Sequence, residues 1–361
     1  MKIIFNPPDN KENQYINLMV APLRASGFEI YALDDFFSSY KHFKSIDLVH
    51  LNWFENVDDS SFFVALRSFF RKMVVLLAIR LFKKPLVWTM HNRSSHEKGL
   101  RFFSRTLNKL LIKWADRIII HSHISRHILI ERNAQVASKI VYLPHPNFID
   151  VYGPILPGSN DSSGILNLLF IGVVKPYKNI ELLIKLAKEF KTDLILTIAG
   201  KPASEKYGRA LEEIGKDAEN LNLQLRFIED TEIPDLFREV DLLVLPYDLE
   251  SSLNSGTVIL AFSYGKTVIC PLIGTLDDMQ EVHEDILTYR YNGKKEHEAV
   301  LRRTIANAIN LKKAKNDIFK EKGVRLFHYV QQRHNNQQIG KELISIYKSF
   351  KQSVKKEGKT S

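Results

Sequence analysis

Cysteine is nearly absent from this sequence, since Cys270 is the only one among 361 residues. A single thiol excludes an internal disulfide and any metal site built from several cysteines. The first ten residues, MKIIFNPPDN, also lack the hydrophobic core of a secretory signal and are typical of a first β-strand. These absences predict a protein that stays in the reducing cytoplasm.

Two common phosphate-binding motifs are missing as well. The sequence contains no Gly-x-x-x-x-Gly-Lys-Ser/Thr loop, and no Gly-x-Gly-x-x-Gly follows a strand-like segment. Their absence disfavours a P-loop nucleoside triphosphatase and a dinucleotide-dependent dehydrogenase. Any site for a phosphorylated ligand is therefore expected in other loops.

Positive charge is in excess, with a formal net charge of +10. This excess indicates an anionic partner such as nucleic acid, a membrane surface or a phosphorylated substrate. Nucleic acid is disfavoured because the basic residues are interleaved with long aliphatic side chains and do not form one polar face.

Residues 62–82, FFVALRSFFRKMVVLLAIRLF, form the longest hydrophobic run and contain four basic residues. Each of these charges would cost about 2.5–3.5 kcal/mol at the centre of a bilayer, so insertion across a membrane is not expected. The run is predicted to be a hydrophobic helix with basic edges. It either packs in the core with a solvated basic face or docks on an anionic membrane surface.

Strand-like apolar runs alternate with helical patterns along the chain. This alternation predicts an α/β fold with parallel sheets covered by helices on both faces. It is interrupted at residues 150–164, DVYGPILPGSNDSSG, which are rich in Gly, Pro, Ser and Asn. We therefore predict two doubly wound, Rossmann-like domains at residues 1–150 and 165–335, a linker at 151–164, and a C-terminal helix with a basic tail at 336–361 that packs back on the first domain. One strand of the second domain is predicted at Gln224–Ile228.

Ligands of open parallel sheets bind beyond the carboxyl ends of the strands. The stretch FIGVVKPYKN, residues 170–179, is such an end: Gly172 follows the strand, Lys175 and Lys178 stand in the loop, and Asn179 is placed to cap the next helix. Backbone N–H groups at a helix start and two ammonium groups suit a phosphate or diphosphate. A solvated loop is the alternative interpretation.

A second strand-to-helix turn occurs at SLNSGT, residues 252–257. Ser255, Gly256 and Thr257 precede an apolar helix, and this turn would aim N–H groups at a ligand above it. Plain N-capping explains Ser255 or Thr257 alone. It explains less well why two turns suited to anions occur in the same domain.

In the first domain, TMHNRSSH at residues 89–96 places His91 and Asn92 directly after a strand. Their imidazole and amide groups could hydrogen-bond a polar substrate such as a sugar hydroxyl, and His96 either joins them or faces solvent. His123 and His127 share one helical face, but no third ligand with a convincing spacing accompanies them, so no metal site is predicted. His121 and Ser122, just before them, are interpreted as another strand end of the same kind as His91 and Asn92.

The order of these motifs resembles the bacterial glycosyltransferases of the GT-B fold, specifically the retaining, family-4-like group 1 enzymes that use nucleotide sugars. The resemblance covers nearly the whole chain and rests on PPDNKENQY, VWTMHN with His96, YLPHPNFIDVYG, FIGVVKPYKN, VDLLVLPYD and SGTVILAFSYGKTVICP. It implies two Rossmann-like domains that face a central cleft, with the acceptor on residues 1–150 and the nucleotide sugar on residues 165–335.

The resemblance also implies roles for individual residues. Lys175 and Lys178 would contact the donor diphosphate and, with His91 on the transferred sugar, make up the catalytic set. The implied donor site further contains Gly172, Tyr247, Ser255, Gly256 and Thr257. The implied substrate contacts are Asn13, Tyr15, His91, Asn92, His96 and His145.

One departure from the family is clear. Two glutamates that the family often carries would fall at Ser252 and Leu260, so both are absent. Ribose recognition by a carboxylate is therefore not expected there, and a non-catalytic nucleotide- or sugar-binding partner subunit is the alternative function. An epimerase or phosphorylase of the same shape is a weaker alternative, and no lysine-bearing cofactor site supports a phosphorylase.

The reaction implied is transfer of a sugar, of hexosyltransferase type, from a nucleoside diphosphate sugar to a glycan or lipid-linked acceptor. Lysines and turn amides would stabilise the leaving diphosphate, so no metal or other cofactor is expected. Residues 6–13 hold no histidine of the kind that inverting relatives use as a base, which favours retention. The basic hydrophobic helices favour synthesis of a surface polysaccharide, such as a capsule, by a cytoplasmic protein in peripheral contact with the inner face of the plasma membrane.

Overall fold

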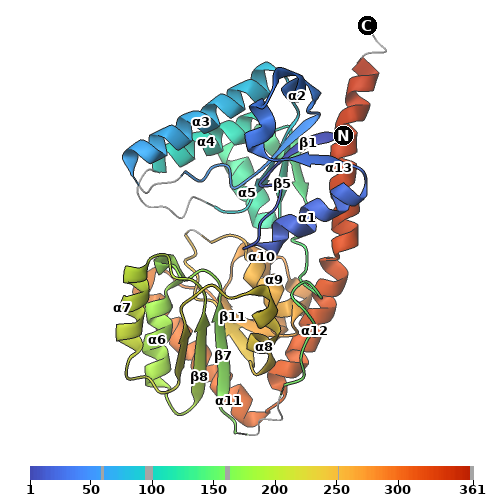
Figure 1. Cartoon of the computed structure of the whole chain (residues 1–361). Coiled ribbons are helices and arrows are strands. Elements are labelled where there is room, and N and C mark those ends of the chain that lie inside the picture. Colours follow the sequence, from blue (N-terminus) through green and yellow to red (C-terminus); the bar gives the residue numbers. More distant parts are fainter. Residues whose placement is uncertain (58–60, 94–100, 159–162, 251, 358–361) are drawn as a thin grey trace. The chain divides into compact units, whose positions relative to one another are not determined.

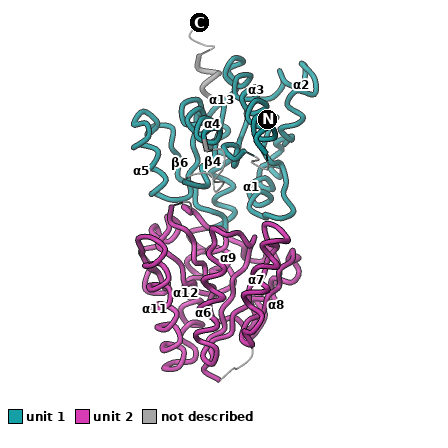
Figure 2. Tube along the Cα trace, turned by 90° about the vertical axis from the view of Figure 1, so that its left-hand side faces the viewer, with its two compact units in different colours: residues 1–146, 335–361 teal, residues 147–334 magenta. Residues whose placement is uncertain are grey.

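A computed structural model describes residues 1–57, 61–93, 101–158, 163–250 and 252–357 (Figure 1). The chain forms two compact units (Figure 2). The first unit comprises residues 1–146 and 335–361, and the second comprises residues 147–334.

The first unit is built on a six-stranded parallel sheet with the order β2-β1-β3-β4-β5-β6. Every residue of its central strands β3 and β4 is buried, as expected where helices cover both faces of a parallel sheet. The strands are β1 (Lys2–Asn6), β2 (Glu29–Tyr31), β3 (Leu48–Asn52), β4 (Leu86–Met90), β5 (Arg117–Ile120) and β6 (Ile140–Tyr142). The helices are α1 (Gln14–Ala25), α2 (Tyr40–Ser45), α3 (Phe62–Leu81), α4 (Arg101–Trp114), α5 (His123–Arg132) and α13 (Asn336–Glu357).

The C-terminal helix α13 is part of the core of the first unit. Its Leu343 and Tyr347 are fully buried in one cluster with α1 residues such as Met19. A Cβ atom on Gly340 would lie 2.7 Å from Cβ of Pro22, so the two helices approach closely at this glycine. Residues from both ends of the sequence therefore share one core.

The second unit has a six-stranded parallel sheet with the order β12-β11-β10-β7-β8-β9. Its strands are β7 (Leu166–Ile171), β8 (Leu194–Ala199), β9 (Leu221–Gln224), β10 (Leu242–Val244), β11 (Thr267–Pro271) and β12 (Leu287–Tyr289). Its helices are α6 (Ile180–Glu189), α7 (Glu205–Gly215), α8 (Ile233–Arg238), α9 (Gly256–Ser263), α10 (Gly274–Asp277), α11 (Gly293–Ala314) and α12 (Ile318–Arg333). The predicted α/β class with two doubly wound parallel sheets is confirmed.

The strand predicted at Gln224–Ile228 is wrong, because β9 ends at Gln224. Alternation of apolar residues continues past this point and hides the end of the strand. The backbone turns there, since Arg226 N–H donates to the Gln224 carbonyl at 2.9 Å. The Arg226 guanidinium then binds Glu232 at 2.6 and 2.8 Å and directs the chain away from the sheet.

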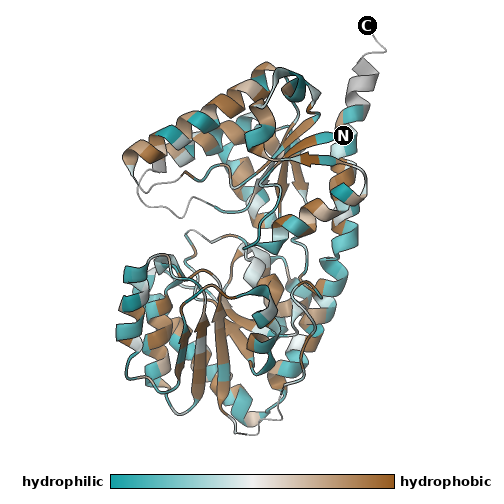
Figure 3. Cartoon of the chain, viewed as in Figure 1, coloured by the Kyte–Doolittle hydropathy of each residue, from teal (hydrophilic) through white to brown (hydrophobic). Residues whose placement is uncertain are grey.

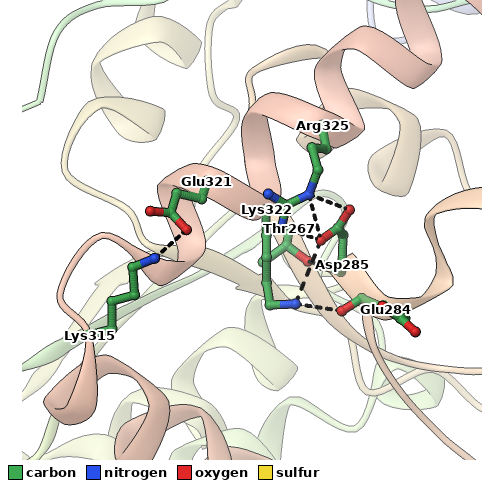
Figure 4. A network of polar contacts seen from close by, with 7 residues as sticks. All are labelled: Thr267, Glu284, Asp285, Lys315, Glu321, Lys322 and Arg325. Carbon is green, nitrogen blue, oxygen red and sulfur yellow. Dashed lines mark hydrogen bonds and ion pairs between the residues drawn. The ribbon is translucent and has the colours of Figure 1, made fainter.

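Helix α12 packs against α9 and β11 of the second unit. A Cβ atom on Gly323 would lie 1.8 Å from the carbonyl oxygen of Gly265, so α12 touches the turn that follows α9. Arg325 of α12 holds the Asp285 carboxylate with contacts of 2.6–3.0 Å, and Lys322 lies 3.7 Å from the same carboxylate (Figure 4). The Thr267 hydroxyl at the start of β11 donates to the Asp285 carbonyl at 2.5 Å. This network ties α12 to the sheet that carries the site described next.

Candidate functional site

The strand order of the second unit has a switch point between β7 and β10. The chain goes from β7 to β8 on one side, and later strands are added through β10 on the other side. Ligands of doubly wound sheets bind beyond the carboxyl ends of the strands at such a point. The residues that follow these two strands are Gly172 on one side and Pro246 with Tyr247 on the other.

Asn179 connects the two loops at this switch point. Its side-chain amide donates to the Pro246 carbonyl at 2.8 Å. It occupies the N-cap position of α6 with a left-handed backbone (φ 52°), and its side chain makes no capping hydrogen bond. The prediction that Asn179 caps this helix is therefore wrong: its side chain is used to fix the loop after β10.

Gly172 and Gly200 bring the ends of β7 and β8 into close contact. Both have a positive φ, 127° and 150°, and a Cβ atom on Gly200 would lie 2.0 Å from the Gly172 carbonyl oxygen. A Cβ atom on Gly172 itself would lie 3.3 Å from the Lys178 ammonium nitrogen and 3.9 Å from the Thr257 hydroxyl oxygen. Because Gly172 has no side chain, its backbone lies close to both Lys178 and Thr257.

Lys178 is a half-buried cation beside Gly172. Its Nζ lies 5.5 Å from the ring centroid of Phe170 and 5.9 Å from that of Tyr247. Burial, and secondarily the charge of Lys175, lowers its pKa to about 8. The group still carries its charge at neutral pH. Among the described residues, no carboxylate pairs with it.

The turn before α9 lies beside Lys178. The Ser255 hydroxyl accepts the Val258 N–H at 3.2 Å, bonds to the Tyr247 hydroxyl at 3.0 Å, and so caps the helix. The Ser255 N–H donates to the Thr275 hydroxyl at 3.0 Å. The N–H groups of Gly256 and Thr257 follow in the first turn of the helix, where no intrahelical acceptor exists for them.

The structure therefore brings most of the predicted donor-site residues together in the second unit. Gly172, Lys178, Tyr247 and Thr257 lie close to one another, and Ser255 bonds to the Tyr247 hydroxyl. Lys175 is exposed in the same loop. Leu260, one of the positions where the family carries glutamate, is buried inside α9, and Ser252 lies in the loop before it.

In the first unit, ring side chains gather at the carboxyl ends of β3 to β6. His91 stacks on Trp53 with ring centroids 4.0 Å apart, and its Nε2 donates to the Asn52 amide oxygen at 3.0 Å. The Asn52 amide nitrogen in turn donates to the Asn6 carbonyl at 3.2 Å, which fixes the orientation of this amide. We call the following residues the ring cluster: Tyr15, Trp53, His91, His121 and His145.

Hydrogen bonds fix the proton positions of His121. Its Nδ1 donates to the Leu143 carbonyl at 2.7 Å, so in the neutral ring Nε2 accepts from the Tyr15 hydroxyl at 3.0 Å. His145 lies against the same tyrosine, with ring centroids 5.0 Å apart. Tyr15 therefore links two histidines of the cluster.

Burial keeps His91 and Tyr15 of the ring cluster uncharged at neutral pH. It lowers the pKa of His91 well below its ordinary value, and the neighbouring His121 and His145 add to the effect. It also raises the pKa of the Tyr15 hydroxyl. The arrangement can donate and accept hydrogen bonds at neutral pH without presenting a net charge.

Hydrogen bonds connect the C-terminal helix α13 to strands β3 and β4, which lead into the ring cluster. The Tyr347 hydroxyl contacts Nδ1 of His50 on β3, and Nε2 of His50 bonds to the Thr89 hydroxyl on β4 at 2.7 Å. Burial lowers the pKa of His50 to about 3. Helix α13 thereby helps to hold the two strands that carry Asn52 and His91.

The other predicted substrate residues are less closely gathered. Asn13 caps α1, and its side chain accepts the Tyr15 N–H at 3.1 Å. Asn92 follows His91 and is half-buried, and His145 donates from Nδ1 to the Pro146 carbonyl at 2.8 Å. His96 lies outside the described residues.

Two members of the first-unit site were not predicted from the sequence. Asn52 is the last residue of β3, which lies next to β1, and Trp53 follows it with a left-handed backbone (φ 48°). Their stretch, VHLNW, reads as an ordinary buried strand. The feature that marks these residues as part of the site is their position at the switch point between β1 and β3. That position can be recognised only when the order of the strands in the sheet is known.

No metal centre is evident in the described ranges, where no group of three or more His, Cys, Asp or Glu side chains could hold a metal ion.

Comparison with known proteins gives a family match for part of the chain and a fold for nearly all of it. Residues 162–318 match the family described as glycosyl transferases group 1. No curated protein sequence matches the chain significantly. Several solved structures match it over nearly its full length.

One of these structures is HepE from Anabaena in complex with UDP and glucose, with 15% identity, a TM-score of 0.68, and 96% of this chain and 99% of that chain covered. Sucrose-phosphate synthase from Thermosynechococcus elongatus has 13% identity and a TM-score of 0.71, with 98% and 99% covered. WaaG, a glycosyltransferase involved in lipopolysaccharide biosynthesis, has 12% identity and a TM-score of 0.68, with 96% and 99% covered. Residues 162–318 therefore resemble the group 1 glycosyltransferases, and the whole chain has the GT-B fold that the sequence motifs predicted.

Proposed function

We propose that this chain transfers a sugar, as a hexosyltransferase, from a nucleoside diphosphate sugar to a glycan or lipid-linked acceptor. The second unit binds the donor beside Gly172, Lys178 and Thr257, which lie close to one another. UDP is the first nucleotide to test, because HepE was solved with UDP and glucose.

The observation that carries this proposal is the environment of Lys178. A half-buried ammonium group costs free energy unless an anion compensates it, and the described residues supply no carboxylate. The cation lies beside a glycine with no side chain and beside the first turn of α9. A diphosphate satisfies the ammonium group and the first-turn N–H groups together.

The same groups suit the chemistry of the donor. The diphosphate gains negative charge as the bond to the sugar breaks, and a fixed cation lowers the energy of that state. Lys175 adds a second, exposed charge in the same loop. Ser255 has both its hydroxyl and its N–H engaged, so we assign it to holding the turn, with Gly256 and Thr257 as the donors to phosphate.

The ring cluster suits uncharged hydroxyl groups. His91 is neutral, and with Nε2 donating to Asn52 its Nδ1 is a hydrogen-bond acceptor. We propose that His91 contacts the transferred sugar, and that Asn13, Tyr15, Asn92 and His145 shape or contact the sugar-binding part of the first unit.

The finer features of the reaction are part of this proposal. We propose retention of the anomeric configuration, because residues 6–13 offer no histidine base, and catalysis without a metal, because lysine and backbone groups carry the charge. We further propose that the product is a surface polysaccharide such as a capsule, made in the cytoplasm at the inner face of the membrane.

The test is a nucleotide screen followed by an activity assay. Thermal unfolding is measured with UDP, GDP, ADP, CMP and TDP, and hydrolysis of the corresponding sugar donors is then followed. We expect one nucleoside diphosphate to raise the unfolding temperature and its sugar form to be hydrolysed slowly. If none of the nucleotides changes the unfolding temperature, the proposal is wrong.

The alternative function is a non-catalytic partner subunit that binds a nucleotide or a sugar. It is favoured by Ser252 and the buried Leu260 at positions where the family carries glutamate. The same assay separates the two functions. If the protein binds a nucleotide but neither hydrolyses nor transfers the sugar of any donor tested, the partner subunit is favoured.

A further inference from the structure

Helix α3 presents an exposed apolar stripe along its whole length. Phe63, Phe70, Val74, Leu77 and Leu81 are all exposed, with Phe63 80% and Leu81 74% accessible. Their spacings of 7, 4, 3 and 4 residues place them within about 60° of the helix circumference at 100° per residue. Figure 3 shows the brown of hydrophobic residues recurring along this helix. The stripe is thus one continuous face.

The opposite face of α3 is fixed to the first unit. Its buried residues Ala65, Val75, Leu76 and Ile79 point away from the stripe. Lys72, on the same buried side, donates to the carbonyl of Phe54 at 3.0 Å and also contacts that of Asn56. The helix is therefore held in place by its inner face, and its outer face has no role in the core.

Positive charge flanks the stripe, and negative charge is absent from its two helices. The 20 residues of α3 and the 14 of α4, which packs against it, contain no Asp or Glu. Arg67 and Arg80 are exposed on either side of the stripe. Helix α4 adds exposed Phe102, 73% accessible, and the exposed basic residues Arg105, Lys109 and Lys113.

An apolar hollow continues the stripe on the side of Arg71. It has a volume of about 420 Å³ and is lined by Leu33, Asp34, Phe37, Arg71, Val74 and Val75. Arg71 pairs with Asp34 at its rim, and Phe37 is half exposed. The hollow widens the apolar surface beyond a single helix face.

We propose that the outer face of α3 docks on a membrane surface that contains anionic lipids. The helix lies in the plane of the interface, with its aromatic and aliphatic stripe among the acyl chains and its arginines at the headgroups. Within the described ranges, none of the helices combines the length and the low charge needed to cross a bilayer, so the contact is peripheral.

Charge favours this occupant over two others. A second copy of the chain would bring together two faces that both carry an excess of positive charge, which repel one another, since Asp34 at the rim is already paired with Arg71. The phosphates of a nucleic acid would be attracted by the arginines, but they would not bury the five apolar side chains of the stripe. An anionic bilayer satisfies both the charge and the apolar surface.

This inference does not depend on the transferase activity. It concerns a surface formed by α3 and α4, whereas the donor site belongs to the second unit. Membrane binding and nucleotide binding are therefore measured separately, and either can fail without the other.

The experiment is sedimentation of the full chain with vesicles of phosphatidylglycerol and phosphatidylcholine, compared with vesicles of phosphatidylcholine alone. We expect binding to the anionic vesicles, weak binding to the neutral ones, and weaker binding as salt is raised. Phe70→Ser removes one inserted aromatic ring and lowers the partition coefficient about 10-fold. Arg80→Gln lowers it about 5-fold.

Val324→Ser is the matched apolar control, because Val324 is 49% exposed on α12 in the second unit. Lys216→Gln is the matched charge control on an exposed lysine. Both controls are expected to bind vesicles as the unchanged protein does, and all four variants are expected to keep its unfolding temperature within the error of the measurement.

Equal binding to neutral and anionic vesicles would overturn the proposal. So would unchanged binding of Phe70→Ser together with Arg80→Gln. Self-association in sedimentation velocity that is lost in Phe70→Ser would assign the stripe to a second copy of the chain and overturn it as well.

Discussion

The sites of the two units differ in how they treat charge. In the second unit, burial lowers the pKa of Lys178 to about 8, which still leaves a cation at neutral pH. In the first unit, burial lowers the pKa of His91 well below its ordinary value and raises that of Tyr15, so both side chains are uncharged at neutral pH. Both sites lie beyond the carboxyl ends of parallel strands at a switch point in strand order.

The difference indicates a division of roles on two similar scaffolds. A cation without a carboxylate partner attracts an anion such as a diphosphate, and a neutral cluster of donors and acceptors selects uncharged hydroxyls. The two sheets are alike and do not distinguish these roles. The residues in the loops after the strands distinguish them, so variants of those residues can test the difference between the two sites.

The largest expected effect is on the backbone of the second-unit site. Gly200→Ala places a Cβ atom 2.0 Å from the Gly172 carbonyl oxygen at a φ of 150°. Strain and overpacking together should lower the free energy of unfolding by roughly 3–6 kcal/mol. Urea unfolding followed by circular dichroism measures the loss.

Gly293→Ala is the matched control, because Gly293 also has a positive φ, 76°, but nothing lies within 4 Å of the added atom. Its expected cost is about 1–2 kcal/mol, from backbone strain alone. If the two variants lose the same free energy of unfolding, the ends of β7 and β8 are not packed closely enough to exclude a Cβ atom at Gly200.

The second prediction concerns turnover. His91→Ala should lower kcat/KM for sugar transfer about 100-fold, because one oriented polar group at the reacting sugar is lost. UDP affinity should change less than about 2-fold, since the nucleotide binds to the second unit. Steady-state kinetics and calorimetry measure the two effects.

His127→Ala, on an exposed position of α5, is the control and should leave both values unchanged. A loss of UDP affinity in His91→Ala with normal turnover of the bound donor would reverse the roles assigned to the two units.

Acid should destabilise the first unit more than the second. His50 and His91 have lowered pKa values in the folded chain, so the unfolded chain binds their protons more readily. The stability that they contribute is complete above pH 6.5 and is lost as pH falls below it, by about 2 kcal/mol at pH 5 for His50, with a loss in the same direction for His91. In the second unit, burial lowers the pKa of His297 to about 4.

Tryptophan fluorescence separates the units, because all three tryptophans, Trp53, Trp88 and Trp114, lie in the first unit. At pH 5 the fluorescence transition in urea should precede the later part of the circular dichroism transition. Coincident transitions at pH 5 would contradict the difference in buried histidines.

The smallest effect is the pH dependence of nucleotide binding. Because the pKa of Lys178 is about 8, its charge is lost as pH rises, and UDP affinity should fall about 10-fold between pH 7 and pH 9. Lys178→Ala should show no such fall. A similar fall in that variant would assign the titration to another group.

Much of the second unit could be predicted from its sequence. The strand before Gly172 and the apolar helix after Ser255 both have clear local patterns, and the lysines and the Ser-Gly-Thr turn follow from those boundaries. What local patterns could not predict was the end of β9, where alternation continues past Gln224, and the left-handed backbone of Asn179, which prevents it from capping α6.

The first-unit site was harder to predict for a physical reason. Residues His91, Tyr15 and His145 were singled out in the sequence, but Asn52 and Trp53 were not. They belong to the site because β3 lies next to β1 in the sheet, and the order of strands is set by packing over long sequence distances. The contribution of Tyr347, near the other end of the chain, was hidden for the same reason. The roles of all these residues stay predictions until they are measured.

Calorimetric titration of UDP into the unchanged protein, Lys178→Ala and Lys188→Ala tests the central claim most directly. Lys188 is an exposed lysine on α6 and serves as the control. The account predicts that Lys178→Ala weakens UDP binding about 30-fold, or ~2 kcal/mol, and that Lys188→Ala leaves it unchanged. Equal affinities for all three proteins would contradict the assignment of Lys178 to the donor diphosphate.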